Sequence, residues 1–134
     1  MVDVRLQTEI VIEAEDRVGV VAEVSRLLAE MGINLLSIMV RTEGELAYVH
    51  LVTTSQTYAL DALRKACFEV SERDVVLVEL PHHPGFLNKV SEALARKDLA
   101  VDELYATVPE TGAIGVVVFR CSDNRHAVQL LRGR

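Results

Sequence analysis

The chain is poor in the residues that mark several functional classes. Among its 134 residues there is no tryptophan, only 4% are aromatic, and 14 basic residues face 20 acidic ones, for a net charge of −6. A protein that binds nucleic acid needs a basic face for the phosphates, and single-strand readers also stack bases on aromatic side chains. The composition therefore argues against a nucleic-acid partner.

Cysteine and long apolar runs are also scarce. The two cysteines are Cys67 and Cys121, and no apolar leader stands at the N-terminus. This favours a reducing, cytoplasmic setting over a disulfide scaffold, and we expect both thiols to behave as buried hydrophobic groups. No apolar run approaches the roughly 20 residues that span a bilayer, so we expect no membrane partner.

Catalytic motifs are missing as well. The sequence offers no P-loop, no nucleophile elbow, no cluster of metal ligands and no paired acid and base. We therefore expect no catalytic residue, no metal and no cofactor, and we predict that the chain is not an enzyme.

What the sequence does contain is a regular succession of short apolar segments, since half of its residues are hydrophobic. Alternating or β-branched segments predict strands at 7–14, 33–41, 46–53, 75–80, 99–108 and 114–120. Apolar residues at helical spacing predict helices at 20–31, 58–67, from 85 onward, and at 124–132.

The second half of the sequence repeats the first. A shift of 66 positions places Gly19 on Gly85, and the same shift aligns the flanking strand and helix. Matches at one constant offset indicate a single folding unit written twice. We predict an α+β protein with two ferredoxin-like βαββαβ units in tandem, at residues 1–72 and 73–134. Each unit has an antiparallel sheet with its helices on one face.

The second unit is predicted to be truncated at its C-terminus. After the helix at 124–132 only Gly133 and Arg134 remain, which cannot form a closing strand. The missing last strand leaves a sheet edge open unless another segment pairs with it.

Four short motifs carry a resemblance to a known family. They are DRVGV at 16–20 and MGINL at 31–35, repeated as HHPGF at 82–86 and KDLAV at 97–101. With the element order, they make the chain similar to stand-alone tandem ACT domain proteins. These are small regulatory modules that bind amino acids. The resemblance implies a ligand held between two ACT units, a homodimer, and a partner enzyme of amino-acid metabolism.

The resemblance also implies which residues form the site. Asp16 matches the family's polar turn position and Asn34 its strand-start asparagine, whereas the second copy has His82 and Ala100 there. Glycine lets a ligand approach the backbone, and a helix start favours a carboxylate. The expected ligand-binding residues are Asp16, Arg17, Val18, Gly19, Val20, Asn34, His82, His83, Gly85 and Phe86.

Other interpretations fit the same residues. Asp16 also suits a helix N-cap, and the two glycines suit turns that need positive φ. The functional alternative is a dimerisation or scaffold module without a ligand, and an enzyme is less favoured.

Overall fold

The computed structural model describes residues 3–81, 84–107 and 114–132. Contacts divide the chain into two compact units. We call residues 8–73 the first unit, and residues 1–7 together with 74–134 the second unit. Two strands, β1 (Asp3–Glu15) and β4 (Glu69–Pro81), run from one unit into the other.

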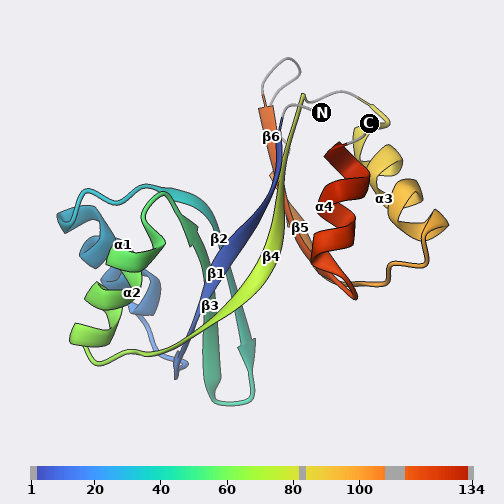
Figure 1. Cartoon of the computed structure of the whole chain (residues 1–134). Helices are drawn as coiled ribbons and strands as arrows, with labels where there is room; N and C mark the ends of the chain where they lie inside the picture. Colours follow the sequence, from blue (N-terminus) through green and yellow to red (C-terminus); the bar gives the residue numbers. More distant parts are fainter. Residues whose placement is uncertain (1–2, 82–83, 108–113, 133–134) are drawn as a thin grey trace. The chain divides into compact units, whose positions relative to one another are not determined.

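The first unit is built from strands with helices on one face (Figure 1). Its remaining elements are α1 (Val20–Glu30), β2 (Leu35–Glu43), β3 (Leu46–Thr53) and α2 (Gln56–Lys65). The strands lie in the order β2-β3-β1-β4, and β3 is antiparallel to both β1 and β2. This is the arrangement predicted from the sequence, with helix and strand bounds shifted by a few residues.

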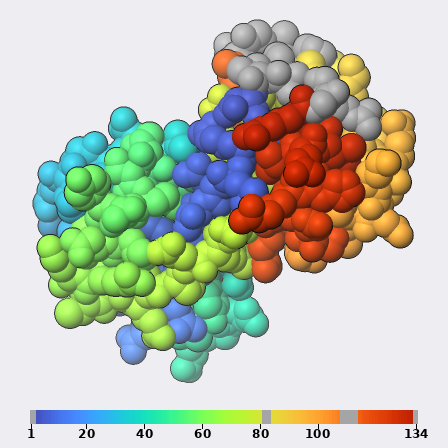
Figure 2. All heavy atoms as spheres, in the orientation of Figure 1, coloured from blue at the N-terminus to red at the C-terminus, as the bar shows by residue number. Residues whose placement is uncertain are grey.

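The core of the first unit is formed by apolar side chains at every second position of its strands. Ile10 and Ile12 point to the same side of β1, and they pair in register with Leu51 and Val49 of β3. All four side chains are fully buried. The apolar faces of α1 and α2 complete this core with Val24, Leu28, Ala59 and Leu63. In the space-filling view, the green atoms of α2 form part of the outer surface (Figure 2).

The second unit repeats this plan. It contains α3 (Phe86–Arg96), β5 (Val101–Ala106), β6 (Ile114–Cys121) and α4 (Asn124–Arg132), with the strand order β1-β4-β6-β5. The helices α1 and α3 begin and end 66 positions apart, as the repeat predicts. Its core includes Val76, Val78, Val90, Leu94, Val117, Phe119 and Leu131.

The start of β1 supplies the strand that the second copy lacks. No strand follows α4 in the described residues, and residues 1–7 belong to the second unit. Val4 is buried in that unit's core, and Leu6 packs against it. The Nε atom of Arg132 donates a hydrogen bond to the carbonyl of Val4 at 2.9 Å. A distant segment thus closes the edge that the sequence left open.

The strands β1 and β4 have matching double roles. Each is 13 residues long, and they start 66 positions apart, at Asp3 and Glu69. The C-terminal part of β1 is the first strand of the first unit, and the N-terminal part of β4 is its last strand. The N-terminal part of β1 serves as the last strand of the second unit. The sequence predicted shorter strands, at 7–14 and 75–80, because their outer ends carry charged residues.

Glycine begins α1 and α3. Gly19 and Gly85 are the N-cap residues, with φ angles of 93° and 95°, in the left-handed region. No side chain caps either helix within the described residues, so Asp16 is not the N-cap that its sequence position allowed. A Cβ atom would strain this backbone, which explains why glycine stands at both places.

One cysteine differs from expectation. Cys121 is buried in the second core as predicted, but Cys67 is exposed. Cys67 follows the end of α2 with a φ of 67°, and its N–H donates to the carbonyl of Arg64 at 2.9 Å. The position is therefore a helix C-terminal turn rather than a core position. Among the described helices, none is long and apolar enough to cross a bilayer.

Candidate functional site

The turn between β1 and α1 is fixed to the neighbouring hairpin. The backbone N–H of Asp16 donates to the carbonyl of Glu45 at 2.9 Å. Arg17 Nη2 lies 2.7 Å from Glu23 Oε2 on the first turn of α1. Val18 is fully exposed, whereas Val20 is 4% exposed and anchors the helix in the core. The turn therefore presents an apolar side chain and a carboxylate at a rigid helix start.

The first turn of α1 has unused donors. In any α-helix the first N–H groups lack intrahelical acceptors, and they carry the positive end of the helix dipole. No side chain of the described residues caps them here. Space around Gly19 is open, because no described residue other than its chain neighbours lies within 4 Å of the place where a Cβ would stand. An anionic group can approach this backbone closely.

Asn34 lies at the other end of the same unit. Its carbonyl accepts a hydrogen bond from the N–H of Thr54, just beyond the end of β3, at 3.0 Å. The turn at Asp16 instead adjoins Glu45, just before the start of β3. The eight residues of β3 span about 25 Å. Asp16 and Asn34 of one unit are therefore not brought together, and a site that uses both needs a second unit of this kind.

The second unit has a similar helix start at Gly85, followed by Phe86. The ring of Phe86 packs partly buried against the second core, with Lys89 Nζ 5.5 Å from the ring centroid. The predicted site residues His82 and His83 lie outside the described residues. As at Gly19, no described residue other than its chain neighbours lies within 4 Å of the place where a Cβ of Gly85 would stand.

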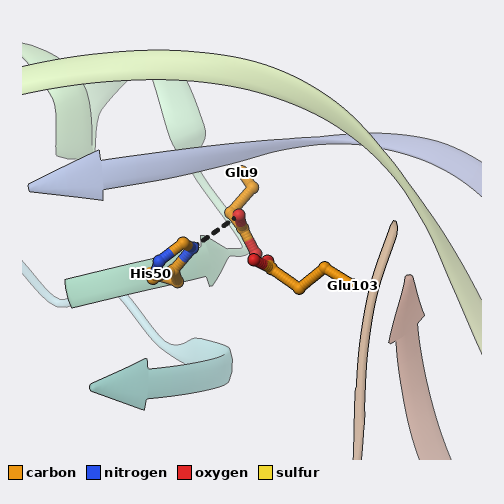
Figure 3. Close-up of side chains that lie close together, drawn as sticks. All are labelled: Glu9, His50 and Glu103. Carbon is orange, nitrogen blue, oxygen red and sulfur yellow. Dashed lines mark hydrogen bonds and ion pairs between the residues drawn. The ribbon is translucent and has the colours of Figure 1, made fainter. Parts of the chain in front are cut away.

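A buried polar cluster in the first unit was not predicted. Glu9 and His50 have no exposed surface, and Glu9 Oε1 lies 2.9 Å from His50 Nδ1 (Figure 3). Arg73 Nε donates to the same oxygen of Glu9 at 2.9 Å, and Arg41 Nε donates to His50 Nε2 at 3.2 Å. In the sequence, Glu9 and His50 stand next to core residues of β1 and β3. This alternation of polar and apolar residues was the only local pattern that could have pointed to the cluster.

Both ring nitrogens of His50 face an arginine. Arg41 Nε lies 3.2 Å from Nε2, and Arg73 Nη2 lies 2.9 Å from Nδ1, which also faces the carboxylate of Glu9. The cluster links all four strands of the first unit, through Glu9 on β1, Arg41 on β2, His50 on β3 and Arg73 on β4. We interpret it as a structural network, because Glu9 Oε1 and both ring nitrogens of His50 have protein partners.

Comparison with known proteins relates the first unit to a family. The sequence profile of the ACT domain matches residues 8–67. Residues 8–67 are an ACT domain. This match coincides with the first unit, in which β1, α1, β2, β3 and α2 follow the predicted order. No curated protein matches the chain.

Several solved structures share the fold along nearly the whole chain. Protein BT0572 from Bacteroides thetaiotaomicron is 24% identical, with a TM-score of 0.87, over 97% of this chain and 89% of that one. The ligand-free regulatory subunit of aspartate kinase from Thermus thermophilus is 20% identical, with a TM-score of 0.68, over 97% and 95%.

A catalytic protein also contains this fold. Aspartokinase III from E. coli, in complex with lysine and aspartate, is 19% identical with a TM-score of 0.53. The match covers 97% of this chain but only 31% of the aspartokinase. The fold of this chain is thus shared with the regulatory subunit of aspartate kinase, and the α+β fold of two tandem units expected from the sequence is confirmed.

Proposed function

We propose that the protein is a regulatory module that binds a small molecule, most simply an amino acid, and has no catalytic activity of its own. The observation that carries this proposal is the uncapped start of α1 behind Gly19, with open space before it. The α-carboxylate of a ligand would accept hydrogen bonds from the first N–H groups of α1. Asp16, whose carboxylate is exposed in the same turn, would hold the ammonium group.

The apolar residues beside this turn suit a ligand with an apolar side chain. Val18 is fully exposed, and Val21 is 42% exposed on the first turn of α1. Arg17 is engaged with Glu23, so its charge does not compete directly for the ligand carboxylate. The neighbouring regulatory subunits of aspartate kinase and the lysine- and aspartate-bound aspartokinase support the choice of an amino acid.

A homodimer through β2 would complete the site. β2 lies at the end of the strand order, and it exposes Leu35, Ile38 and Val40 by 36–43%. An unpaired edge is a template for another strand. If two β2 strands pair antiparallel about Met39, the start of one strand lies beside the end of the other. Asn34 of one copy then approaches the Glu45 carbonyl and the Asp16 turn of its partner.

Ligand binding is tested by thermal unfolding with each common amino acid at millimolar concentration. A ligand at 100 times its dissociation constant adds about 2.7 kcal/mol of stability. We expect one or a few amino acids to raise the unfolding temperature. Asp16→Asn should abolish this shift, whereas Glu15→Gln, which removes a neighbouring charge outside the turn, should retain it. Identical melting curves for all amino acids would refute the proposal.

The dimer favours a second candidate function, a scaffold without a ligand, because the exposed residues of β2 need no small molecule to pair. Val40→Arg places a charge on the edge and should give a monomer in light scattering. If the ligand site spans two copies, this monomer also loses the thermal shift. A dimer that binds no amino acid would favour the scaffold.

A further inference from the structure

The first unit contains a cavity that is separate from the turn at Gly19. Its volume is about 170 Å³, and its lining comes from three strands. Val11 alternates with the core residues Ile10 and Ile12, so it faces the side of the sheet away from α1 and α2. The lining residues are Val11, Glu13, Tyr48, Glu69, Val70 and Ser71.

The lining is negatively charged. It holds the carboxylates of Glu13 and Glu69 and contains no basic residue. Arg41 lies beside the lining, with its Cζ 4.2 Å from the centroid of the Tyr48 ring. Its Nη1 is bound to Glu43 at 3.0 Å, so this charge is engaged outside the lining. Among the described residues, none forms a hydrogen bond or ion pair with the carboxylate of Glu69.

Tyr48 completes one wall of the cavity. Its hydroxyl donates to Glu13 Oε1 at 3.2 Å, and the two residues are paired in register on β3 and β1. Partial burial, followed by the hydrogen bond and negative charge of Glu13, raises the pKa of Tyr48. The phenol therefore remains a neutral donor and orients the carboxylate of Glu13.

We propose that this cavity binds a small alkylammonium cation, with its charged head between Glu13 and Glu69 and its methylene groups against Val11. Since a water molecule occupies about 30 Å³, the volume suits a ligand of roughly five or six heavy atoms. The apolar side chain of Val11 offers no ligand to a bare metal ion, which needs oxygen ligands on every side. The carboxylates of Glu13 and Glu69, the hydroxyl of Tyr48 and the apolar side chain of Val11 together match an amine with a short alkyl chain.

The test is an NMR titration of the full chain with 1-aminobutane, using 1-butanol and butyrate as probes of the same length. We expect saturable shifts of the amides of Tyr48, Glu69 and Ser71 with the amine alone. A charge-assisted hydrogen bond supplies enough energy for Glu69→Gln to weaken binding about tenfold. Glu72→Gln removes the same charge from β4 outside the lining, and it should leave the affinity unchanged.

Asp16→Asn separates this cavity from the proposed amino-acid site, because it should abolish amino-acid binding and leave amine binding intact. Equal shifts with 1-butanol, the absence of saturable shifts with 1-aminobutane, or equal affinities of the two glutamine variants would overturn the assignment. Saturable shifts at the same amides with calcium alone, and none with the amine, would also overturn it.

Discussion

The place of Val4 in the second core is the most direct test of the shared strand. Val4 is 4% exposed and packs among residues that lie more than 70 positions away in the sequence. Val4→Ala removes two buried methyl groups, each worth about 0.8 kcal/mol in transfer free energy, and leaves a small cavity. We expect it to lower the free energy of unfolding by about 2 kcal/mol in urea denaturation followed by circular dichroism.

Two further valine-to-alanine changes provide matched controls. Val70 occupies the equivalent place in β4, 66 positions on, but it is only partly buried against the first core. Val70→Ala should therefore cost about half as much as Val4→Ala. Val18 is fully exposed, and Val18→Ala should change stability by less than about 0.5 kcal/mol. If Val4→Ala is as mild as Val18→Ala, the N-terminal strand does not belong to the second core.

Three other predictions follow from single side chains. Cys67→Gly should stabilise the protein by about 0.5–1 kcal/mol in the same urea assay, because glycine adopts the φ of 67° without strain; a loss of stability would contradict this. Burial raises the pKa of Cys121 above its ordinary value of 9.0, so the unfolded chain loses that proton first as pH rises. Part of the stability present below pH 9.0 should therefore be lost above it, and less so in Cys121→Ala. Glu9→Ala removes the carboxylate that both His50 and Arg73 contact, and it should cost about 3 kcal/mol; a change under about 1 kcal/mol would show that the cluster is dispensable.

Several site features were readable from the sequence, and others were not. The turn with Gly19 and its counterpart Gly85 was predicted from the repeat alone, because a backbone position with positive φ before a helix favours glycine in both copies. Asn34 was also named from the motif, but its distance from Asp16 depends on strand register. That register is set by which residues of β1, β2 and β3 pair, and no local pattern states it.

The buried cluster was missed for a related reason. Glu9 and His50 stand in apolar segments, where period-two alternation places them on the face away from the core. Alternation predicts that such residues are exposed to water. Their burial depends on what covers that face of the sheet, and this is a tertiary property.

The sequence by itself determined the folding unit, its duplication, and the glycines that start α1 and α3, because helix periodicity, strand alternation and backbone sterics act over short stretches. Only the tertiary structure decided that the start of β1 closes the second unit. Val4 and Leu6 carry an apolar alternation too short to predict a partner, and a strand edge can be satisfied by any segment that reaches it with matching hydrogen bonds. Chain proximity favours local pairing, but here the burial of Val4 and the hydrogen bond from Arg132 favour a segment from the opposite end of the chain.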